Sequence, residues 1–321
     1  MGEGLGGEGQ QKMGALKELL ATGRTIILDS AMGTELQTRG VSVKLPLWSA
    51  QALIDKPDTV RHIHIDNIDT GADIITTNTF RTQSRTYRKA DYHYKEYDFA
   101  ETARHFTTDA VDLAKDAVMI AAEENEVIVA GCIAPLEDSY RPDLTPDTDT
   151  LCTEHYEHMK NLADAGVDIF IAETLTSIRE ISAVLNQIHK FGLDSILSIT
   201  PRNDKELFSG EPISEAVSII NKYTPDVLCI NCIHPHMVEP VIAHLKTLTE
   251  IPLGVYANIG DPNYKADPKH KENDPMKRTV TPDEYLKYAQ KWKSMGVRLI
   301  GGCCGTNPLY IAKLSHLKGK K

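Results

Sequence analysis

The chain has 321 residues, of which 41% are apolar and 25% are charged, and 35 Lys and Arg against 45 Asp and Glu give a formal charge of −10. This composition supplies a large hydrophobic core and excludes disorder as the overall state. No run approaches the roughly 18 consecutive apolar residues of a membrane span. The acidic balance argues against nucleic acid as the main partner, because basic residues cluster only in the last four positions, Lys318-Gly319-Lys320-Lys321.

The first twelve residues, MGEGLGGEGQQK, contain no apolar run typical of a signal peptide. Gly6 stands where a myristoylation signal requires Ser or Thr. We therefore predict a flexible tail over residues 1–12, one domain over residues 13–318, and a cytoplasmic location.

Eight times along the chain, a short apolar run is followed by a turn and a helical stretch. Near-continuous apolar runs are typical of parallel strands covered on both faces, and strands that alternate with helices imply right-handed βαβ crossovers. Eight units in about 290 residues match a single (β/α)8 (TIM) barrel. The expected strands are residues 25–28, 72–76, 126–130, 167–172, 195–199, 227–230, 253–256 and 297–300.

Local signals mark two of the helices and two long loops. Ser177 with Glu180, and Thr281 with Glu284, have the spacing of capping boxes at helix starts. Residues 135–150 and 258–280 follow the third and seventh strands, at the end of the barrel where active sites lie. Connections of this length are usually functional or disordered, and we predict that both loops cover a substrate.

The six cysteines are the most informative feature of the sequence. In a chain without an export signal, cysteines are more often metal-binding, catalytic or buried than disulfide-bonded. Cys229 and Cys232 end the sixth strand, and side chains three apart on a strand point to opposite faces. We therefore predict that Cys229 faces the helices, whereas Cys232 lies at the mouth of the barrel.

Cys303 and Cys304 end the eighth strand between glycines that let the backbone turn sharply. One strand separates the sixth strand from the eighth, so Cys232, Cys303 and Cys304 can meet across the mouth. Three thiolates suit Zn²⁺, and three protein ligands with an open fourth position are typical of a catalytic site. The alternatives are a strained vicinal disulfide, two unrelated thiols, or a tetrahedron closed by His234 or His236.

The chain resembles the homocysteine S-methyltransferase family from about residue 25 to residue 312. The pair of motifs Asn-Cys and Gly-Gly-Cys-Cys-Gly is the most specific part of this resemblance. The matching segments are residues 27–36 (ILDSAMGTEL), 46–49 (PLWS), 72–80 (ADIITTNTF), 172–174 (AET), 231–232 (NC) and 301–305 (GGCCG).

The resemblance implies a zinc-containing barrel in which Cys232, Cys303 and Cys304 hold the metal and the thiol of homocysteine takes the fourth position. Zinc deprotonates a coordinated thiol. The resulting thiolate attacks a methyl group on a positively charged centre. We predict an enzyme that makes methionine with S-methylmethionine or S-adenosylmethionine as the methyl donor.

The resemblance also assigns residues to the substrates. Asp29 and Glu173, at the ends of the first and fourth strands, match the acidic residues that bind the amino group of homocysteine. Trp48 matches an aromatic residue that can cover the cationic centre of the donor. Asn231, next to Cys232, is a polar residue near the mouth, and we expect it to hydrogen-bond the substrate or to support the residues that do.

Departures from the family pattern border the donor side. They are Ser30 in place of a common Gly, residues 132–138 (CIAPLED), and residues 256–260 (YANIG). The sequence leaves open a betaine donor, a separate corrinoid protein partner, a homo-oligomer, and a non-catalytic subunit stabilised by zinc.

Overall fold

The structure is a computed structural model, and it describes residues 14–122, 126–260 and 278–319. The predicted tail, residues 1–12, lies outside the described residues, as does most of the predicted loop 258–280. Among the described helices, none is long and apolar enough to cross a membrane.

The described strands form one parallel sheet in the order β1-β8-β7-β6-β5-β4-β3-β2. A parallel bridge between Leu28 and Ile74 brings the two ends of this order together, which closes the barrel. All eight predicted strands are confirmed, and so is the (β/α)8 fold. The strands are β1 (Ile26–Ile27), β2 (Ile74–Thr76), β3 (Ile128–Ile133), β4 (Ile169–Leu175), β5 (Ser195–Ile199), β6 (Val227–Asn231), β7 (Leu253–Ala257) and β8 (Leu299–Gly302).

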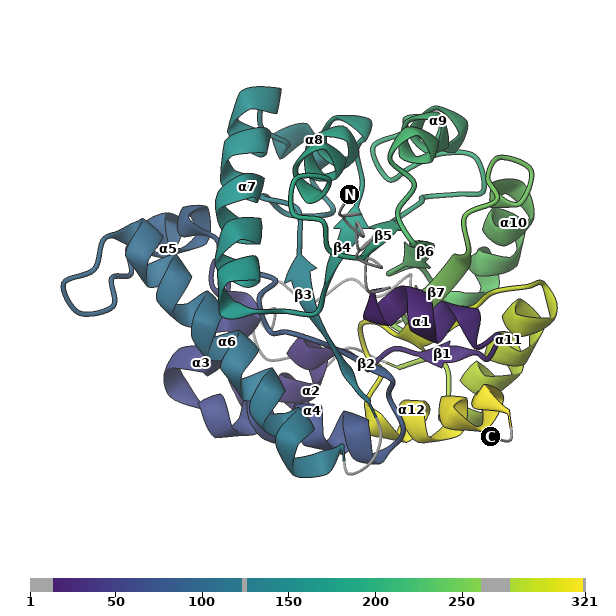
Figure 1. The fold of residues 1–321 in the computed structure, drawn as a ribbon, viewed down its shortest axis with the longest axis horizontal. Helices are drawn as coiled ribbons and strands as arrows, with labels where there is room; N and C mark the ends of the chain where they lie inside the picture. Colours follow the sequence, from purple (N-terminus) through teal and green to yellow (C-terminus); the bar gives the residue numbers. More distant parts are fainter. Residues whose placement is uncertain (1–13, 123–125, 261–277, 320–321) are drawn as a thin grey trace, which may run out of the picture.

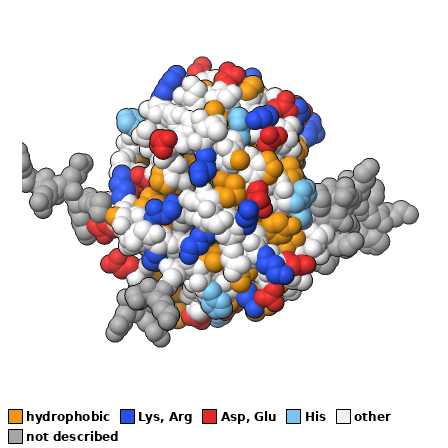
Figure 2. Space-filling model, turned by 90° about the vertical axis from the view of Figure 1, so that its right-hand side faces the viewer, with side chains coloured by type: hydrophobic (Ala, Val, Ile, Leu, Met, Phe, Trp, Pro, Cys, Tyr) orange, Lys and Arg blue, Asp and Glu red, His pale blue; other side chains and the backbone are white. Residues whose placement is uncertain are grey.

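Helices surround this ring of strands (Figure 1). The α-helices of the described residues are α1 (Ala15–Ala21), α2 (Met32–Thr38), α3 (Gln51–Asp55), α4 (Pro57–Asp69), α5 (Ser84–Ala90), α6 (Phe99–Ala121), α7 (Thr148–Ala165), α8 (Ile178–Ile188), α9 (Ile213–Tyr223), α10 (Pro235–Leu245), α11 (Pro282–Ser294) and α12 (Pro308–Ser315). Short 3-10 helices are η1 (Trp48–Ala50), η2 (Pro142–Leu144) and η3 (His316–Lys318). The side that carries α10 and α11 shows basic and acidic side chains interspersed (Figure 2).

Alternation along the strands divides the apolar side chains into two cores. Ile27 and Ile75 belong to the core between strands and helices, whereas Ile26 and Ile74 belong to the core inside the barrel. The first helix, α1, covers the N-terminal end of the barrel, because its Leu16 packs in the inner core. The C-terminal ends of the strands are therefore left to form the open mouth.

The predicted orientation of Cys229 is wrong. Cys229 packs in the inner core of the barrel, and so does Cys232. Strand alternation ends at Asn231, and Cys232 adopts a left-handed backbone with φ 56°. This turn returns the Cys232 side chain to the inner side, so the rule for residues three apart does not apply.

The two predicted helix starts are found, with one difference. Thr281 and Glu284 form the complete capping box at the start of α11. At α8, Ser177 caps the N–H of Glu180, but the Glu180 carboxylate accepts hydrogen bonds from the N–H of Leu136 (2.9 Å) and from His155 (3.1 Å). Glu180 thus anchors the loop after β3 instead of completing its own helix cap.

Candidate metal centre and substrate cavity

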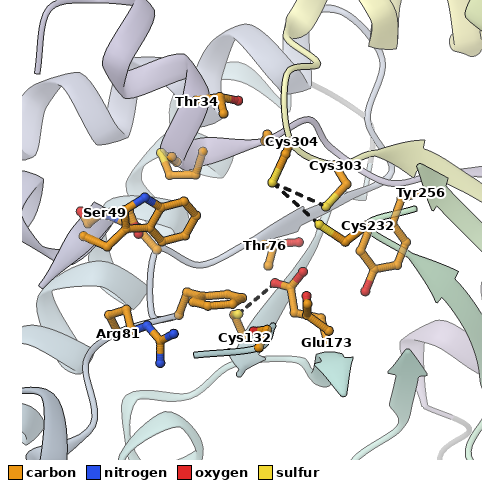
Figure 3. A pocket seen from close by; sticks show the side chains of 18 of the residues that line it. Thr34, Ser49, Thr76, Arg81, Cys132, Glu173, Cys232, Tyr256, Cys303 and Cys304 are labelled. Atoms are coloured by element: carbon orange, nitrogen blue, oxygen red, sulfur yellow. Dashed lines mark hydrogen bonds between the residues drawn. The ribbon is translucent and has the colours of Figure 1, made fainter. Parts of the chain in front are cut away.

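The thiols of Cys232, Cys303 and Cys304 converge at the mouth of the barrel, as predicted (Figure 3). Their sulfur atoms all lie within 4.8 Å of one another. The Sγ of Cys304 is 3.7 Å from that of Cys232 and 4.0 Å from that of Cys303. In the part of the chain that the structure describes, no other group of His, Cys, Asp and Glu side chains meets in this way.

Glycines at the end of β8 make this convergence possible. A Cβ on Gly302 would lie 2.2 Å from Oγ1 of Thr306, and Gly305 has φ +87°. The chain can therefore turn directly after β8, where the N–H of Cys303 donates to the carbonyl of Ala257 at 3.0 Å. Both neighbouring thiols are thereby directed to the same side, which a regular strand forbids.

The spacing of the three sulfurs fits a tetrahedral metal. With Zn–S bonds of about 2.3 Å, tetrahedral sulfurs lie about 3.8 Å apart. Hydrogen bonds from Cys303 and Cys304 lower the pKa of the Cys232 thiol, and hydrogen bonds from Tyr140 and Asn258 act in the same direction. Thiolates are the form in which cysteine binds metals, so the cluster is suited to a thiophilic cation.

The three thiols form part of the wall of a cavity of about 270 Å³. Asp29, Glu173 and Trp48, three of the four predicted substrate residues, also line it. The structure therefore brings together side chains from the ends of β1, β3, β4, β6 and β8. Asn231 is absent from the cavity lining, although it is adjacent to Cys232 in the sequence.

Asp29 follows β1 and is 6% exposed. Its carboxylate accepts hydrogen bonds from the N–H of Thr76 at 2.7 Å and from the Thr76 hydroxyl at 3.0 Å. Burial raises the pKa of Asp29 to about 8 despite these bonds, and no cation of the described residues forms an ion pair with it. A cationic ligand in the cavity would favour the ionised form of this carboxyl group.

Glu173 lies on β4 and faces the same cavity (Figure 3). Burial raises its pKa to about 7. The thiol of Cys132, at the end of β3, donates to Oε1 of Glu173 at 2.9 Å. Two buried carboxyl groups, neither of which forms an ion pair with a described residue, thus lie beside the three thiols, and this arrangement favours a ligand that carries both a thiol and an ammonium group.

Asn231 lies behind Glu173 and is fully buried. Its Oδ1 accepts from the N–H of Thr174 at 3.2 Å and from the hydroxyl of Thr200 at 3.0 Å, and its Nδ2 donates to Oγ1 of Thr174 at 2.9 Å. These contacts hold the backbone next to Glu173, so the predicted contact between Asn231 and substrate stays a prediction without support from the geometry.

Trp48 begins η1 and forms an aromatic corner of the cavity with Phe80. Their ring centroids are 5.4 Å apart and the planes meet at 68°. The preceding loop brings Leu45 to the rim, where it is 71% exposed. Aromatic faces attract cations, so this corner suits a positively charged methyl donor.

The sequence analysis missed Tyr140, which lies on the loop after β3. Its hydroxyl is 3.0 Å from Sγ of Cys232, and its ring packs edge-to-face on Phe208. The buried Arg81 holds this loop by donating to the carbonyls of Pro135 (3.1 Å) and Glu137 (3.0 Å). The loop departs from the family pattern, and no spacing signal in it pointed to the thiols.

The predicted loop 135–150 does border the cavity, through residues 138–140. His234 and His236 do not line the cavity and do not join the thiol cluster. Instead, Nε2 of His234 lies 3.1 Å from Oγ1 of Thr279. Neither histidine is thus placed to close a tetrahedron around the thiols.

Comparison with known proteins agrees with this geometry. The profile of the homocysteine S-methyltransferase family matches residues 26–317. The chain belongs to this family. It is a methyltransferase, as the resemblance implied.

Relatives and solved structures match the methyltransferase over nearly its whole length. A homocysteine S-methyltransferase of Escherichia coli (strain K12) is 31% identical over 313 residues, covering 93% of this chain and 97% of that protein. A selenocysteine Se-methyltransferase of Brassica oleracea var. italica is 28% identical, covering 92% of this chain and 90% of that protein. The metallated form of the homocysteine methyltransferase MmuM from Escherichia coli has a TM-score of 0.79 at 28% identity, covering 94% of this chain and 98% of that one.

Proposed function

We propose that the protein transfers a methyl group to the thiol of homocysteine, giving methionine, and that Cys232, Cys303 and Cys304 hold Zn²⁺ for this reaction. The observation that carries the proposal is the placement of three converging thiols and two buried carboxyl groups in the wall of one cavity. When bound, Zn²⁺ lowers the pKa of a coordinated thiol, so that the nucleophilic thiolate exists at neutral pH. A metallated form of the relative MmuM supports a metal in this protein.

The residues of the chain bind and orient the substrates around the thiols. Glu173 and Asp29 receive the ammonium group of homocysteine, which favours ionisation of both carboxyl groups. Trp48, packed against Phe80, holds the cationic methyl-bearing centre of the donor by cation–π contact. The open side of the thiol cluster faces this cavity, which favours catalysis over a purely structural metal.

We propose a sulfonium donor, S-methylmethionine or S-adenosylmethionine. A neutral thioether leaves more readily than the tertiary amine that a betaine would release. A betaine donor and a corrinoid protein partner are the alternatives. We also propose a cytoplasmic location, because all six cysteines are free, as is usual in a reducing compartment.

A donor screen tests the proposal directly. Zinc-loaded protein is incubated with homocysteine and, separately, S-methylmethionine, S-adenosylmethionine, betaine or a methylated corrinoid, and methionine is measured. Selenocysteine serves as a second acceptor because a relative is named for it. We expect methionine from a sulfonium donor, and its absence with every donor would overturn the proposal.

A further inference from the structure

We propose that Asn231 is a positioning residue: its side-chain amide clamps Thr174 in a left-handed backbone conformation and so fixes the end of β4 directly after Glu173. The proposal rests on the role of Glu173 in binding homocysteine that is proposed above. It replaces direct contact between Asn231 and substrate with a structural link between two substrate-binding segments.

The first observation is an irregularity of β4 directly after Glu173. Ala172 pairs with Leu197 on β5, whereas Leu175 pairs with Ile199, so three steps on β4 match two on β5. An extra residue in a strand bends it and changes the direction of the adjacent side chain. Phe170, Ile171 and Ala172 alternate regularly, so Glu173 faces inward, and the irregularity follows it, where it returns Leu175 to the outer core.

The second observation is the backbone of Thr174, which has φ 61°. Left-handed backbone is unfavourable for a β-branched residue and persists where the surroundings hold it. Thr174 is 4% exposed, so its backbone N–H needs a partner within the protein. The bulge therefore requires a specific clamp.

Asn231 provides that clamp with both ends of its amide. Oδ1 accepts from the N–H of Thr174, and Nδ2 donates to its Oγ1. A flipped amide would place a donor against the N–H of Thr174, so the orientation of the amide is fixed by the contacts. The Thr200 hydroxyl on the following strand supports Oδ1 at 3.0 Å.

The position of Asn231 in the chain gives the clamp its significance. The next residue is Cys232, whose left-handed turn brings its thiol to the cluster. One segment at the end of β6 therefore fixes both a thiol of the cluster and the end of β4 directly after Glu173.

The test compares homocysteine affinity in zinc-loaded variants by isothermal titration calorimetry, with zinc content measured in parallel. Asn231→Ala is expected to raise the dissociation constant about tenfold, the lower end of what losing a charge-assisted hydrogen bond costs. Zinc content is expected to stay unchanged. Adding Thr174→Gly to Asn231→Ala is expected to restore the affinity to within about threefold, because glycine adopts φ > 0 without a clamp.

Three results would overturn the proposal: unchanged affinity in Asn231→Ala, loss of zinc in that variant, or failure of Thr174→Gly to rescue it. The last result would indicate that Asn231 contacts the substrate directly. Thr200→Val is the matched control, because it removes one bond to Asn231 without touching Thr174, and its affinity is expected to stay near that of the wild type.

If Asn231→Ala does not fold, single changes at Thr174 give the same test. Thr174→Val keeps the β-branched strain and loses the bond to Nδ2, so affinity is expected to fall, whereas Thr174→Gly is expected to keep it. Equal affinities in these two variants contradict the proposal. Glu173→Ala distinguishes failure of the proposed function from failure of the clamp. If homocysteine affinity is unchanged in Glu173→Ala, the proposed role of Glu173 is wrong. If binding is weaker in Glu173→Ala but normal in Asn231→Ala, only the clamp is wrong.

Discussion

A buried aspartate lies at each end of the barrel, and the two aspartates differ in their ionic partners. At the N-terminal end, Asp73 is 4% exposed and pairs with both Arg24 (2.7 Å) and Lys318 (2.7 Å). It also accepts a hydrogen bond from the N–H of Ile27 at 2.8 Å, which joins β1 to β2. This carboxylate is fully satisfied by the protein itself, and it stabilises the closure of the barrel.

At the C-terminal end, Asp29 is buried to a similar degree, but its hydrogen-bond partner is Thr76, and within residues 14–122, 126–260 and 278–319 no cation pairs with it. Burying a carboxyl group without an ionic partner costs stability. We infer from this difference that the mouth is arranged to bind a ligand, whereas the opposite end is arranged for stability.

The largest expected effect concerns the thiol cluster at the mouth. Changing Cys232, Cys303 or Cys304 to Ala is expected to abolish zinc binding, which should be about one ion per wild-type chain, because two thiolates do not make a stable zinc site. Metal analysis of the purified variants measures this. Cys229→Ala is the control, since Cys229 lies deeper in the inner core, and loss of zinc in that variant alone would contradict the assignment.

Removing zinc is expected to expose the same thiols to oxidation. A chelator in air should abolish activity, with the thiols losing two electrons and two protons to oxygen as a disulfide forms. The three sulfurs lie within 4.8 Å of one another, so we expect a peptide map to show a disulfide between two of these thiols and recovery to require a reductant with zinc. An unchanged circular dichroism spectrum distinguishes oxidation from unfolding. A peptide map in which all thiols can still be alkylated would contradict the prediction.

A mutation at the N-terminal end of the barrel should change the stability of the protein and not its ligand binding. Asp73→Ala leaves Arg24 and Lys318 without their carboxylate partner and is expected to lower the free energy of unfolding by about 3 kcal/mol, the low end for removing one partner of a buried pair, because both cations are partly exposed. Urea denaturation measures this change. Homocysteine affinity should stay that of the wild type, and a weakened affinity would remove the contrast between the two ends.

Glu173→Ala should show the reverse pattern. Loss of a charge-assisted hydrogen bond to the ammonium group should cost about 1.5–3 kcal/mol of homocysteine binding. The variant should retain zinc and gain stability or keep it, because an unpaired buried carboxyl group is removed. Calorimetric titration checks the affinity, with Cys152→Ala as a neutral control, since Cys152 packs beside Leu136 and Leu151 away from the cavity.

The barrel was predictable from the sequence because apolar runs of parallel strands depend on local pattern alone. The thiol cluster was predictable because its three members end neighbouring even-numbered strands. Cys229 was placed on the wrong face since the left-handed turn at Cys232 has no signal in a residue that is not glycine.

Other parts of the site depend on contacts between distant segments. Tyr140 reaches Cys232 because Arg81 and Glu180 hold the loop after β3 by its backbone. Asn231 belongs to a motif of the family, but the motif does not show that its amide forms a hydrogen bond with Thr174, 57 positions earlier. Tertiary hydrogen bonds to backbone atoms leave no spacing pattern in a single sequence, so these roles required the structure.

The smallest expected effect is the pH dependence of stability that Asp29 produces. Its pKa is about 8 in the folded protein against 3.8 for the ordinary group. Between these values the folded state binds more protons than the unfolded state, so the free energy of unfolding falls as pH rises, and the contribution present below the lower value is lost through the higher one.

Asp29→Asn removes this titration and keeps an oxygen that accepts from the N–H of Thr76. The drop in Tm between about pH 5 and about pH 8 should therefore be a few degrees smaller in Asp29→Asn than in the wild type. Glu173 acts with the same sign in both proteins, so the difference between them isolates Asp29. Saturating homocysteine should reduce the drop in the wild type, since its ammonium group pairs with the ionised carboxylate. Identical pH profiles for the two proteins would show that Asp29 ionises normally. Asp29 and Asp73 would then differ in position but not in the effect of burial on their ionisation.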